Sequence, residues 1–177
     1  MSINTKSAII LAAGFGKRMS HLTHEVPKPL ISFKGKPLIQ YSIDFLESLE
    51  VQEIIINVHY KSEKIKEFLK NLSNSKIKIS DESSEILDTG GGVKKAMSLI
   101  NGSESIVVNS DVLWDEKQIS SLKAMDIMFE RNACDALLCL SSVKNTKGYK
   151  GEGDFVFLDD NKICRYQSND KDPFVYC

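Results

Sequence analysis

Glycines and cations gather in one stretch near the start of the chain. The run Leu-Ala-Ala-Gly-Phe-Gly-Lys-Arg-Met occupies residues 11–19, and Pro-Lys-Pro-Leu follows at residues 27–30. Gly14 and Gly16 allow a sharp turn in which backbone N–H groups come close to a ligand. Lys17, Arg18 and Lys28 add positive charge around that turn. Because the turn follows an apolar run, the stretch predicts a phosphate-binding loop at the end of a first strand.

Two well-known phosphate loops do not fit this stretch. The dinucleotide fingerprint needs a third glycine where Met19 stands, and an acidic residue about 20 positions later. The Walker A loop needs a Gly-Lys-Ser/Thr step that the sequence does not have in that spacing. The remaining pattern, Gly-x-Gly-x-Arg followed by Pro-Lys-Pro, resembles the signature of the sugar-1-phosphate nucleotidyltransferases. That family joins a nucleoside triphosphate to a sugar 1-phosphate and releases pyrophosphate. The alternative from the residues alone is a glycine turn with a solvated basic face.

The resemblance implies roles for these residues. The amides of Gly14 and Gly16 would hold the triphosphate, Arg18 would contact the β- and γ-phosphates, and Lys28 would contact the α-phosphate in the transition state. Arg18 and Lys28 are therefore the expected catalytic residues. No protein nucleophile is needed, because positioning and charge neutralisation suffice for such a transfer. The expected nucleotide-binding residues are Leu11, Ala12, Ala13, Gly14, Gly16, Lys17, Asn57, Thr89, Gly90 and Gly91.

A second glycine-rich stretch begins Asp88-Thr89-Gly90-Gly91-Gly92. Because consecutive glycines weaken a helix interior, we expect them to lead into a helix that runs from about residue 92 to residue 100. A flat base could then lie on Gly90 and Gly91, with Thr89 capping the helix or contacting the ligand. A flexible glycine linker is the alternative. The Thr-Gly-Gly-Gly version is similar to bacterial N-acetylmuramate-1-phosphate uridylyltransferases and their mannose-1-phosphate guanylyltransferase-like relatives. In that family this segment recognises the nucleobase, so UTP or GTP is expected.

A third stretch is the apolar run at residues 105–109 that ends in Ser110 and Asp111. It predicts a buried strand with Asp111 at its carboxyl end, where a carboxylate could bind Mg²⁺ that bridges phosphates. Taken alone, Asp111 would more often be a cap for the helix that follows than a metal ligand. In the family the matching segment usually reads Asn/Tyr-Gly-Asp and its aspartate binds magnesium; Ser110 replaces the glycine here. The resemblance also implies sugar contacts from Asn109, Gly153 and Asp154, although Asp154 could instead be a turn acid.

Alternating strands and helices must position these residues. Strands are predicted at residues 7–11, 53–58 and 76–80, the last with Ile77 and Ile79 pointing inward. Helices are predicted at residues 38–49 and from Ser62 onward, with Lys61, Lys64, Lys66 and Lys70 on a solvated face. This order favours right-handed crossovers and a mostly parallel sheet covered by helices on both faces. The predicted fold class is therefore α/β, a Rossmann-like three-layer α/β/α arrangement with ligands beyond the carboxyl ends of the strands.

The rest of the chain predicts a mixed tail. We expect a helix at residues 116–132 with Ile127 and Met128 mainly in the core, and a strand at 135–143. A loop at 144–152 is a candidate flap over the sugar half of the site. A hairpin follows at 153–158 and 162–166, and the last residues, 174–177, fit a strand. A length of 177 residues suggests one domain, and the resemblance implies that the family's domain continues beyond this chain.

Composition and charge exclude several classes of protein. Residues 1–36 carry six Lys or Arg and one acid, while the net charge of the whole chain is −1. Such a local excess fits a small polyanion, and it is too concentrated and too poor in aromatic residues for a nucleic-acid surface. No run is long and apolar enough for a membrane span. The four cysteines form no Cys-x-x-Cys pair and the first residues lack a signal peptide's apolar core, so we expect a cytoplasmic protein.

Two other functions remain open from the residues. A cytidylyl- or molybdopterin-type nucleotidyltransferase shares Gly-x-Gly-x-Arg-Met, although Pro-Lys-Pro-Leu and Thr-Gly-Gly-Gly favour the sugar branch. A catalytically incomplete domain that binds a nucleotide or a partner protein is the non-enzymatic alternative.

Overall fold

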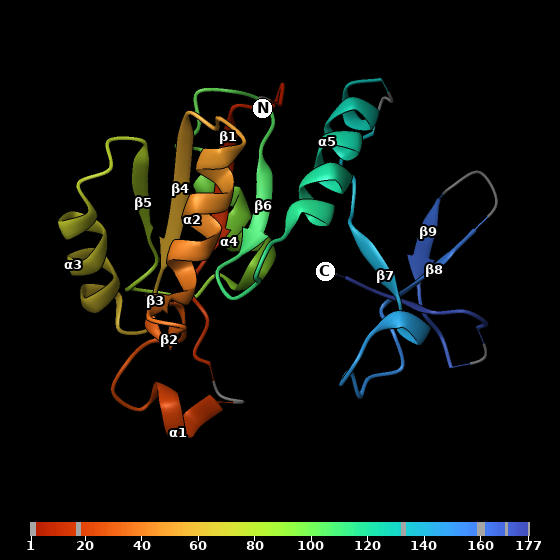
Figure 1. Cartoon of the computed structure of the whole chain (residues 1–177), viewed down its shortest axis with the longest axis horizontal. Helices are drawn as coiled ribbons and strands as arrows, with labels where there is room; N and C mark the ends of the chain where they lie inside the picture. The colour runs from red at the N-terminus through yellow and green to blue at the C-terminus, as the bar shows by residue number, and fades with distance from the viewer. Residues whose placement is uncertain (1–2, 17–18, 132–133, 159–161, 169, 177) are drawn as a thin grey trace. The chain divides into compact units, whose positions relative to one another are not determined.

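The structure is a computed structural model that describes residues 3–16, 19–131, 134–158, 162–168 and 170–176. The chain divides into two compact units, Met1–Ser120 and Ser121–Cys177 (Figure 1). Whether both belong to one nucleotidyltransferase domain stays a prediction, and each unit is taken by itself below. Within the described residues, no helix is long and apolar enough to cross a membrane.

The first unit is built on a parallel sheet of four strands. Its strands are β1 (Ser7–Leu11), β4 (Glu53–Val58), β5 (Ile77–Asp81) and β6 (Ile106–Asn109), in the spatial order β5-β4-β1-β6. The register places Ile9 between Ile55 and Val107. β1 and β4 are the central strands, and their β-branched runs are buried along almost their whole length, as expected for strands covered on both faces. The predicted parallel α/β sheet is confirmed.

Helices cover both faces of this sheet. Figure 1 shows α2 (Leu38–Ser48) in front of the strands and α4 (Asp88–Met97) behind them, while α3 (Ser62–Leu72) lies beside β5. Ile9 and Ile55 form a buried cluster with Ala96 of α4. Since side chains alternate along a strand, the neighbouring isoleucines of β1 and β4 point to the opposite face, where Ile43 of α2 is fully buried. Each such side chain contributes about 1.5–3 kcal/mol by leaving water.

Short elements connect β1 to α2. They are α1 (Ser20–Thr23), the 3₁₀ turn η2 (Lys28–Leu30), and the strands β2 (Ser32–Phe33) and β3 (Lys36–Pro37), which form a two-stranded antiparallel sheet. Pro27 precedes η2 in an extended conformation and Pro29 is buried within it. Because both prolines restrict the backbone, the position of Lys28 between them is well defined.

The second unit contains an antiparallel sheet. The helix α5 (Glu116–Arg131) begins in the first unit and continues in the second. The sheet has the order β7-β10-β8-β9, with β7 (Leu140–Ser142), β8 (Phe155–Phe157), β9 (Ile163–Arg165) and β10 (Phe174–Tyr176); the turn η3 (Val143–Asn145) follows β7. β8 and β9 pair as the predicted hairpin. The predicted strand at 135–143 is too long, since β7 covers three residues, and Ile127 and Met128 of α5 are exposed rather than in the core.

Two predictions about the first unit are wrong in detail. The helix after the glycines begins at Asp88, so the glycines lie inside its first turns, and Leu87 rather than Thr89 is its N-cap. At Gly92, close packing against Asn57 and Glu82 outweighs the poor helix propensity of glycine. In β5, Ser80 is buried while Ile79 is 37% exposed. β5 is an edge strand, so the face that carries Ile79 is only partly covered, whereas Ser80 is in register with buried Asn57.

Candidate functional site

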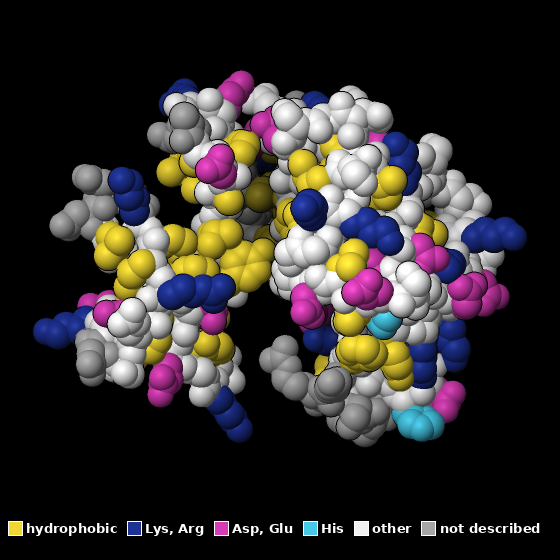
Figure 2. Space-filling view, turned by 180° about the vertical axis from the view of Figure 1, so that it is seen from behind, with side chains coloured by type: hydrophobic (Ala, Val, Ile, Leu, Met, Phe, Trp, Pro, Cys, Tyr) yellow, Lys and Arg dark blue, Asp and Glu magenta, His cyan; other side chains and the backbone are white. Residues whose placement is uncertain are grey.

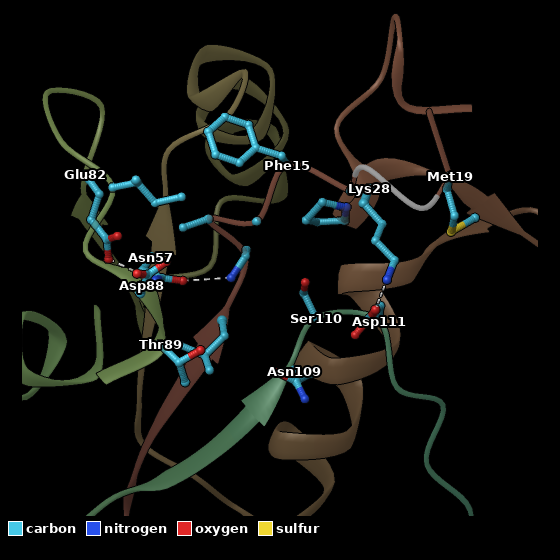
Figure 3. A pocket seen from close by; sticks show the side chains of 17 residues that line it. Phe15, Met19, Lys28, Asn57, Glu82, Asp88, Thr89, Asn109, Ser110 and Asp111 are labelled. Atoms are coloured by element: carbon cyan, nitrogen blue, oxygen red, sulfur yellow. Dashed lines mark hydrogen bonds and ion pairs between the residues drawn. The ribbon is translucent and has the colours of Figure 1, made fainter. Parts of the chain in front are cut away.

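A pocket of about 530 Å³ opens at the carboxyl edge of the parallel sheet (Figure 3). It brings together most of the predicted site residues. These are Leu11, Ala12, Ala13, Gly14, Gly16, Lys28, Asn57, Thr89, Asn109 and Asp111. They come from the ends of β1, β4 and β6, from η2 and from the start of α4. The convergence of these strand ends at one edge follows directly from the parallel topology.

The lining that the structure describes does not include several other predicted residues. Lys17 and Arg18 lie outside the residues that the structure describes. Gly90 and Gly91 belong to the first turn of α4 and are absent from the lining. Gly153 and Asp154 belong to the second unit. There the carboxylate of Asp154 accepts a hydrogen bond from the Tyr176 amide at 3.1 Å.

Gly16 is the glycine that the loop after β1 requires. Its φ is +65°, and a Cβ there would lie 2.8 Å from Thr23 Cγ2 and 3.1 Å from Lys28 Cβ. The Gly16 carbonyl accepts a hydrogen bond from the Met19 amide at 2.9 Å, which closes a tight turn. Gly14, by contrast, has open space where a Cβ would point. The backbone at Gly14 can therefore be approached closely by a ligand.

Residues that follow β4 hold this loop from the side. The ring of Phe15 contacts His59 edge-on, with 5.5 Å between ring centroids. Lys61 donates to the carbonyl oxygens of Thr23 and His24, and Lys64 donates to that of Glu25 at 2.6 Å. The predicted solvated face is confirmed for the exposed Lys64, whereas Lys61 is half-buried, and both side chains also bind carbonyl groups of this loop. Both ammonium groups neutralise carbonyl dipoles of the loop that precedes Lys28.

The end of β4 and the segment after β5 form a buried polar chain behind the loop. Asn57 accepts a hydrogen bond from the Ala12 amide at 2.7 Å and donates one to Glu82 Oε1 at 2.9 Å (Figure 3). Asn57 and Glu82 are 2% and 1% exposed. The second carboxylate oxygen of Glu82 accepts from the Leu87 amide at 3.4 Å, at the N-terminus of α4. A helix N-terminus favours a negative charge, so its amides are suitable partners for a buried carboxylate.

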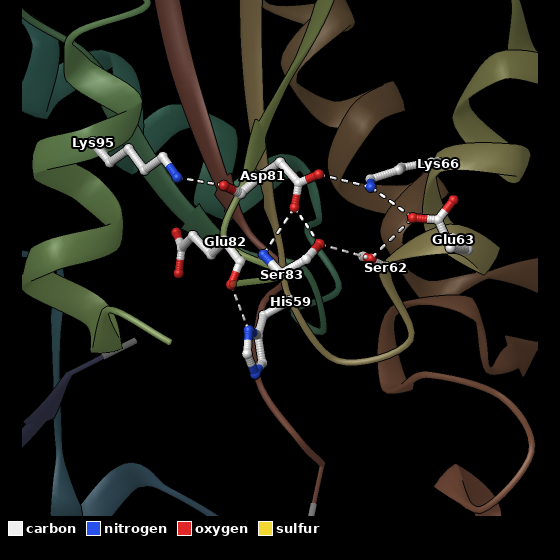
Figure 4. A network of polar contacts seen from close by, with 8 residues as sticks. All are labelled: His59, Ser62, Glu63, Lys66, Asp81, Glu82, Ser83 and Lys95. Atoms are coloured by element: carbon white, nitrogen blue, oxygen red, sulfur yellow. Dashed lines mark hydrogen bonds and ion pairs between the residues drawn. The ribbon is translucent and has the colours of Figure 1, made fainter. Parts of the chain in front are cut away.

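A second polar network fixes the backbone on either side of Glu82 (Figure 4). Lys66 of α3 forms an ion pair with Asp81 at 2.7 Å, and Asp81 accepts hydrogen bonds from the amide and hydroxyl of Ser83. These contacts with Lys66 and Ser83 hold the pKa of Asp81 well below its usual range. The ring Nδ1–H of His59 donates to the Glu82 carbonyl at 2.6 Å. Glu82 is thus held through its backbone as well as its side chain.

Lys28 and Asp111 form an ion pair on the other side of the pocket (Figure 3). Their side chains are 24% and 30% exposed, so both remain accessible from the pocket. The neighbouring Ser110 amide donates to the Leu11 carbonyl at 3.2 Å, which ties the β6 end to the β1 end. A cation and a carboxylate beside the open backbone at Gly14 can neutralise and orient phosphate groups.

The Asp111 carboxylate is an oxygen donor of the kind that suits hard divalent cations. Among the described residues no group of three or more His, Cys, Asp and Glu side chains could form a metal cage. Mg²⁺ needs no such cage, because it is usually bound by one or two carboxylates together with substrate phosphates and water. The Asp111 carboxylate, which lines the pocket, therefore fits Mg²⁺.

Sequence reasoning missed several residues of the pocket. Phe15, Met19, Pro29, Glu82, Ile86, Asp88 and Ser110 also line it. Glu82 could have been found by the rule that directed attention to Asp111, because it follows the carboxyl end of β5. Phe15 carries no comparable signal, since a single aromatic residue in a glycine loop does not indicate its partner.

Known proteins resemble this chain over most of its length. The nucleotidyl transferase family model matches residues 7–165. N-acetylmuramate alpha-1-phosphate uridylyltransferase of Caulobacter vibrioides is 34% identical over 99% of this chain and 74% of its own length. D-glycero-alpha-D-manno-heptose 1-phosphate guanylyltransferase of Campylobacter jejuni is 36% identical over 61% of this chain and 48% of its own.

A solved structure supports the same relationship. HddC from Yersinia pseudotuberculosis, crystallised as a complex with GMP-PN, superposes with a TM-score of 0.57 and 33% sequence identity. The match covers 67% of this chain and 54% of the HddC chain. The chain thus corresponds to about half of that protein's length.

Proposed function

The chain belongs to the nucleotidyl transferase family, and from this premise we propose that it joins a nucleoside triphosphate to a sugar 1-phosphate. The products would be a nucleotide sugar and pyrophosphate. The observation that carries the proposal is the pocket in which Lys28 and Asp111 face the glycine loop at the carboxyl edge of the sheet. UTP and GTP are the nucleotides that we propose, because the relatives are named as uridylyl- and guanylyltransferases.

The proposed reaction is an in-line displacement at the α-phosphorus. A phosphate oxygen of the sugar 1-phosphate forms a bond to that phosphorus, and the bond to the bridging oxygen of the pyrophosphate breaks. No side chain needs to act as a nucleophile, since positioning and charge neutralisation are enough for this transfer. Lys28 would neutralise charge on the α-phosphate in the transition state, and Arg18 charge on the leaving pyrophosphate. The amides of Gly14 and Gly16 would bind the triphosphate.

Magnesium is the metal that we propose for this site, held by Asp111 and the phosphates of the substrate. When bound it would neutralise phosphate charge and orient the reacting groups. In the ion pair between Lys28 and Asp111, each side chain neutralises the charge of the other. Binding of a metal at Asp111 would therefore free the Lys28 ammonium for the phosphate.

The remaining residues would bind the base and the sugar. We propose that Thr89, Gly90 and Gly91 lie near the base, and that Asn109, Gly153 and Asp154 contact the sugar phosphate. Thr89 and Asn109 line the pocket, which supports their part of this assignment.

Pyrophosphate exchange tests the proposal. The chain is incubated with Mg²⁺, radiolabelled pyrophosphate and one UDP- or GDP-sugar at a time, and label in UTP or GTP is measured. Label in one nucleotide supports the proposal and identifies the base. If the chain binds UTP or GTP but exchanges no label with any nucleotide sugar, the incomplete nucleotide-binding domain is correct instead. If it binds neither nucleotide, both alternatives fail.

A further inference from the structure

Asn57 connects the glycine loop to a buried carboxylate. Its side-chain oxygen accepts from the Ala12 amide and its side-chain NH₂ donates to Glu82. Figure 3 shows these contacts in a row at the back of the pocket. All three residues are buried, with at most 2% of each exposed. Water therefore offers these groups no alternative partner of comparable strength, and each depends on the others.

The chemistry of the two neighbours fixes the orientation of the Asn57 amide. The Glu82 Oε1 atom accepts the hydrogen bond that the NH₂ group of Asn57 donates, so this end of the amide faces Glu82. The carbonyl oxygen of the amide must then face Ala12, whose backbone offers a donor. We propose that Glu82 is a positioning residue: by orienting Asn57, it holds Ala12 and thereby sets the conformation of the loop that binds the triphosphate. This inference rests on the proposed function in naming a nucleoside triphosphate as the ligand of the loop.

The third glycine of α4 belongs to the same assembly. A Cβ at Gly92 would lie 2.7 Å from the Asn57 Nδ2 atom and 2.9 Å from the Glu82 Oε1 atom. A side chain there would push apart the two groups whose hydrogen bond orients the amide. Gly92 therefore allows α4 to pack directly against the Asn57–Glu82 pair. The base side of the site, at the start of α4, and the phosphate side, at Ala12, are held by one buried chain.

An exchange of the two polar groups tests this directly. Asn57→Asp places two carboxylates against each other. Glu82→Gln replaces the carboxylate that accepts from the Asn57 amide by a weaker acceptor. It also places an NH₂ group, which cannot accept, close to the N–H of Leu87. In the double variant every hydrogen bond can form again: the introduced aspartate accepts from Ala12 and from the introduced glutamine, whose oxygen accepts from Leu87. One negative charge is kept. We expect each single variant to weaken binding of Mg²⁺-UTP or Mg²⁺-GTP by about 10- to 100-fold, and the double variant to recover most of that loss.

The measurements separate a positioning role from a merely structural one. Nucleotide binding is measured by calorimetry, thermal unfolding is followed for all variants, and hydrogen exchange of the Ala12 amide is measured without nucleotide. Glu53→Gln serves as the matched control, because Glu53 is a buried glutamate at the opposite end of β4 and lies outside the pocket lining. It should lower stability without changing nucleotide affinity or the exchange of Ala12.

Four outcomes decide the proposal. Faster exchange at Ala12 in the single variants, with restored protection and restored affinity in the double variant, supports it. The proposal is overturned if the double variant does not exceed Asn57→Asp in nucleotide affinity, in thermal stability or in protection of the Ala12 amide from exchange. Restored protection without restored affinity also overturns it. If the unaltered chain binds neither UTP nor GTP, the proposed function fails, and the hydrogen-exchange comparison alone decides whether Glu82 sets the loop.

Discussion

A buried glutamate lies at each end of β4, but the two have different surroundings: Glu53 begins the strand, and Glu82, which follows β5, accepts a hydrogen bond from Asn57 near the other end. At the amino edge of the sheet, Glu53 accepts hydrogen bonds from the Lys78 ammonium and from the Asn101 amide and side chain. The Lys78 hydrogen bond is the main cause that holds the pKa of Glu53 below its ordinary value. At the carboxyl edge, Glu82 faces an uncharged amide and a helix N-terminus. Among the described residues, no Lys, Arg or His forms an ion pair with it.

The difference separates a structural cluster from a functional one. At the amino edge the negative charge is compensated inside the protein, and the cluster ties β4 to β5 and to the segment after α4. At the carboxyl edge Lys28 lies on the pocket side, and under the proposed function it would exchange Asp111 for a phosphate. A sheet of parallel strands thus uses one edge for stability and the other for the ligand. Equivalent substitutions at the two edges should therefore differ in their effects on activity and on stability.

The largest effect is expected at Lys28. In a chain that turns over, Lys28→Met should reduce kcat by about 10²–10³-fold while KM changes little, because the lost charge acts mainly in the transition state. The measurement is steady-state pyrophosphate release with varied nucleotide and sugar phosphate. Lys78→Met is the matched control, since it removes the ammonium that pairs with Glu53 at the other edge. We expect its kcat to stay within twofold, on the order of normal variation for sites away from the chemistry.

Equal losses of kcat in Lys28→Met and Lys78→Met would contradict the view that one edge of the sheet serves stability and the other serves the ligand. A rise in KM alone for Lys28→Met would instead mean that Lys28 binds the ground state and the transition state equally.

Asp111→Asn should give the next largest effect. Replacing the carboxylate by an amide should raise the magnesium concentration needed for half-maximal rate by about tenfold or more, since even indirect changes around a metal have effects of that size. Added magnesium should recover part of the rate. The measurement is a magnesium titration of pyrophosphate release, with Asp115→Asn as the control because Asp115 is not part of the pocket lining. A magnesium dependence equal to that of the unaltered chain would remove Asp111 as a metal ligand.

The glycines of α4 allow a comparison of stability within one helix. Gly92→Ala places a Cβ within 3 Å of both Asn57 and Glu82, so it should reduce the free energy of unfolding by about 1–3 kcal/mol. Gly90→Ala meets no atom within 4 Å and should raise it by a few tenths up to about 1 kcal/mol, as alanine is the better helix former. Urea unfolding of the two variants measures the difference. Similar destabilisation by both would mean that the helix backbone, and not the contact with Asn57 and Glu82, sets the need for glycine.

Much of the fold could be predicted from the sequence. Apolar β-branched runs predict the strands β1, β4 and β6, and an apolar stripe predicts the helix α2. The structure has all four elements where they were expected. The parallel topology then places Gly14, Lys28 and Asp111 at one edge, which is why the pocket contains them. These predictions succeed because each depends only on the pattern of apolar residues within one segment and on the rule that right-handed crossovers join parallel strands, whose carboxyl ends share one edge.

The parts that could not be predicted depend on distant contacts. Glycines 90–92 weaken a helix by propensity, yet α4 begins before them because Gly92 must approach the Asn57–Glu82 pair. Lys61 and Lys64 have the pattern of a solvated face, but they bind carbonyl groups of residues 23–25. Neither contact leaves a signature in the spacing of nearby residues. The position of Glu82 after β5 could have been noticed from the sequence, but its hydrogen bonds with Asn57 and the Leu87 amide join separate segments and could not.

The smallest effect that we predict concerns the acid stability of the amino edge. Lys78 holds the pKa of Glu53 below its ordinary value, so the ionised pair stabilises the folded state at neutral pH. A lowered carboxyl pKa contributes stability above the unfolded value of about 4.3, and this contribution is lost as the pH falls through the folded value. Because the Lys78 side chain is 48% exposed and water screens the charge, Lys78→Met should cost only about 0.5–1 kcal/mol near pH 7. Urea unfolding from pH 7 to pH 3 should show the two stability curves beginning to converge near pH 4.3 and meeting as the pH falls through the lower pKa of Glu53 in the folded protein. A difference that stays constant over this range would mean that Lys78 stabilises the sheet by packing of its stem and not by its charge, and the contrast between a compensated and an uncompensated glutamate would lose its electrostatic basis.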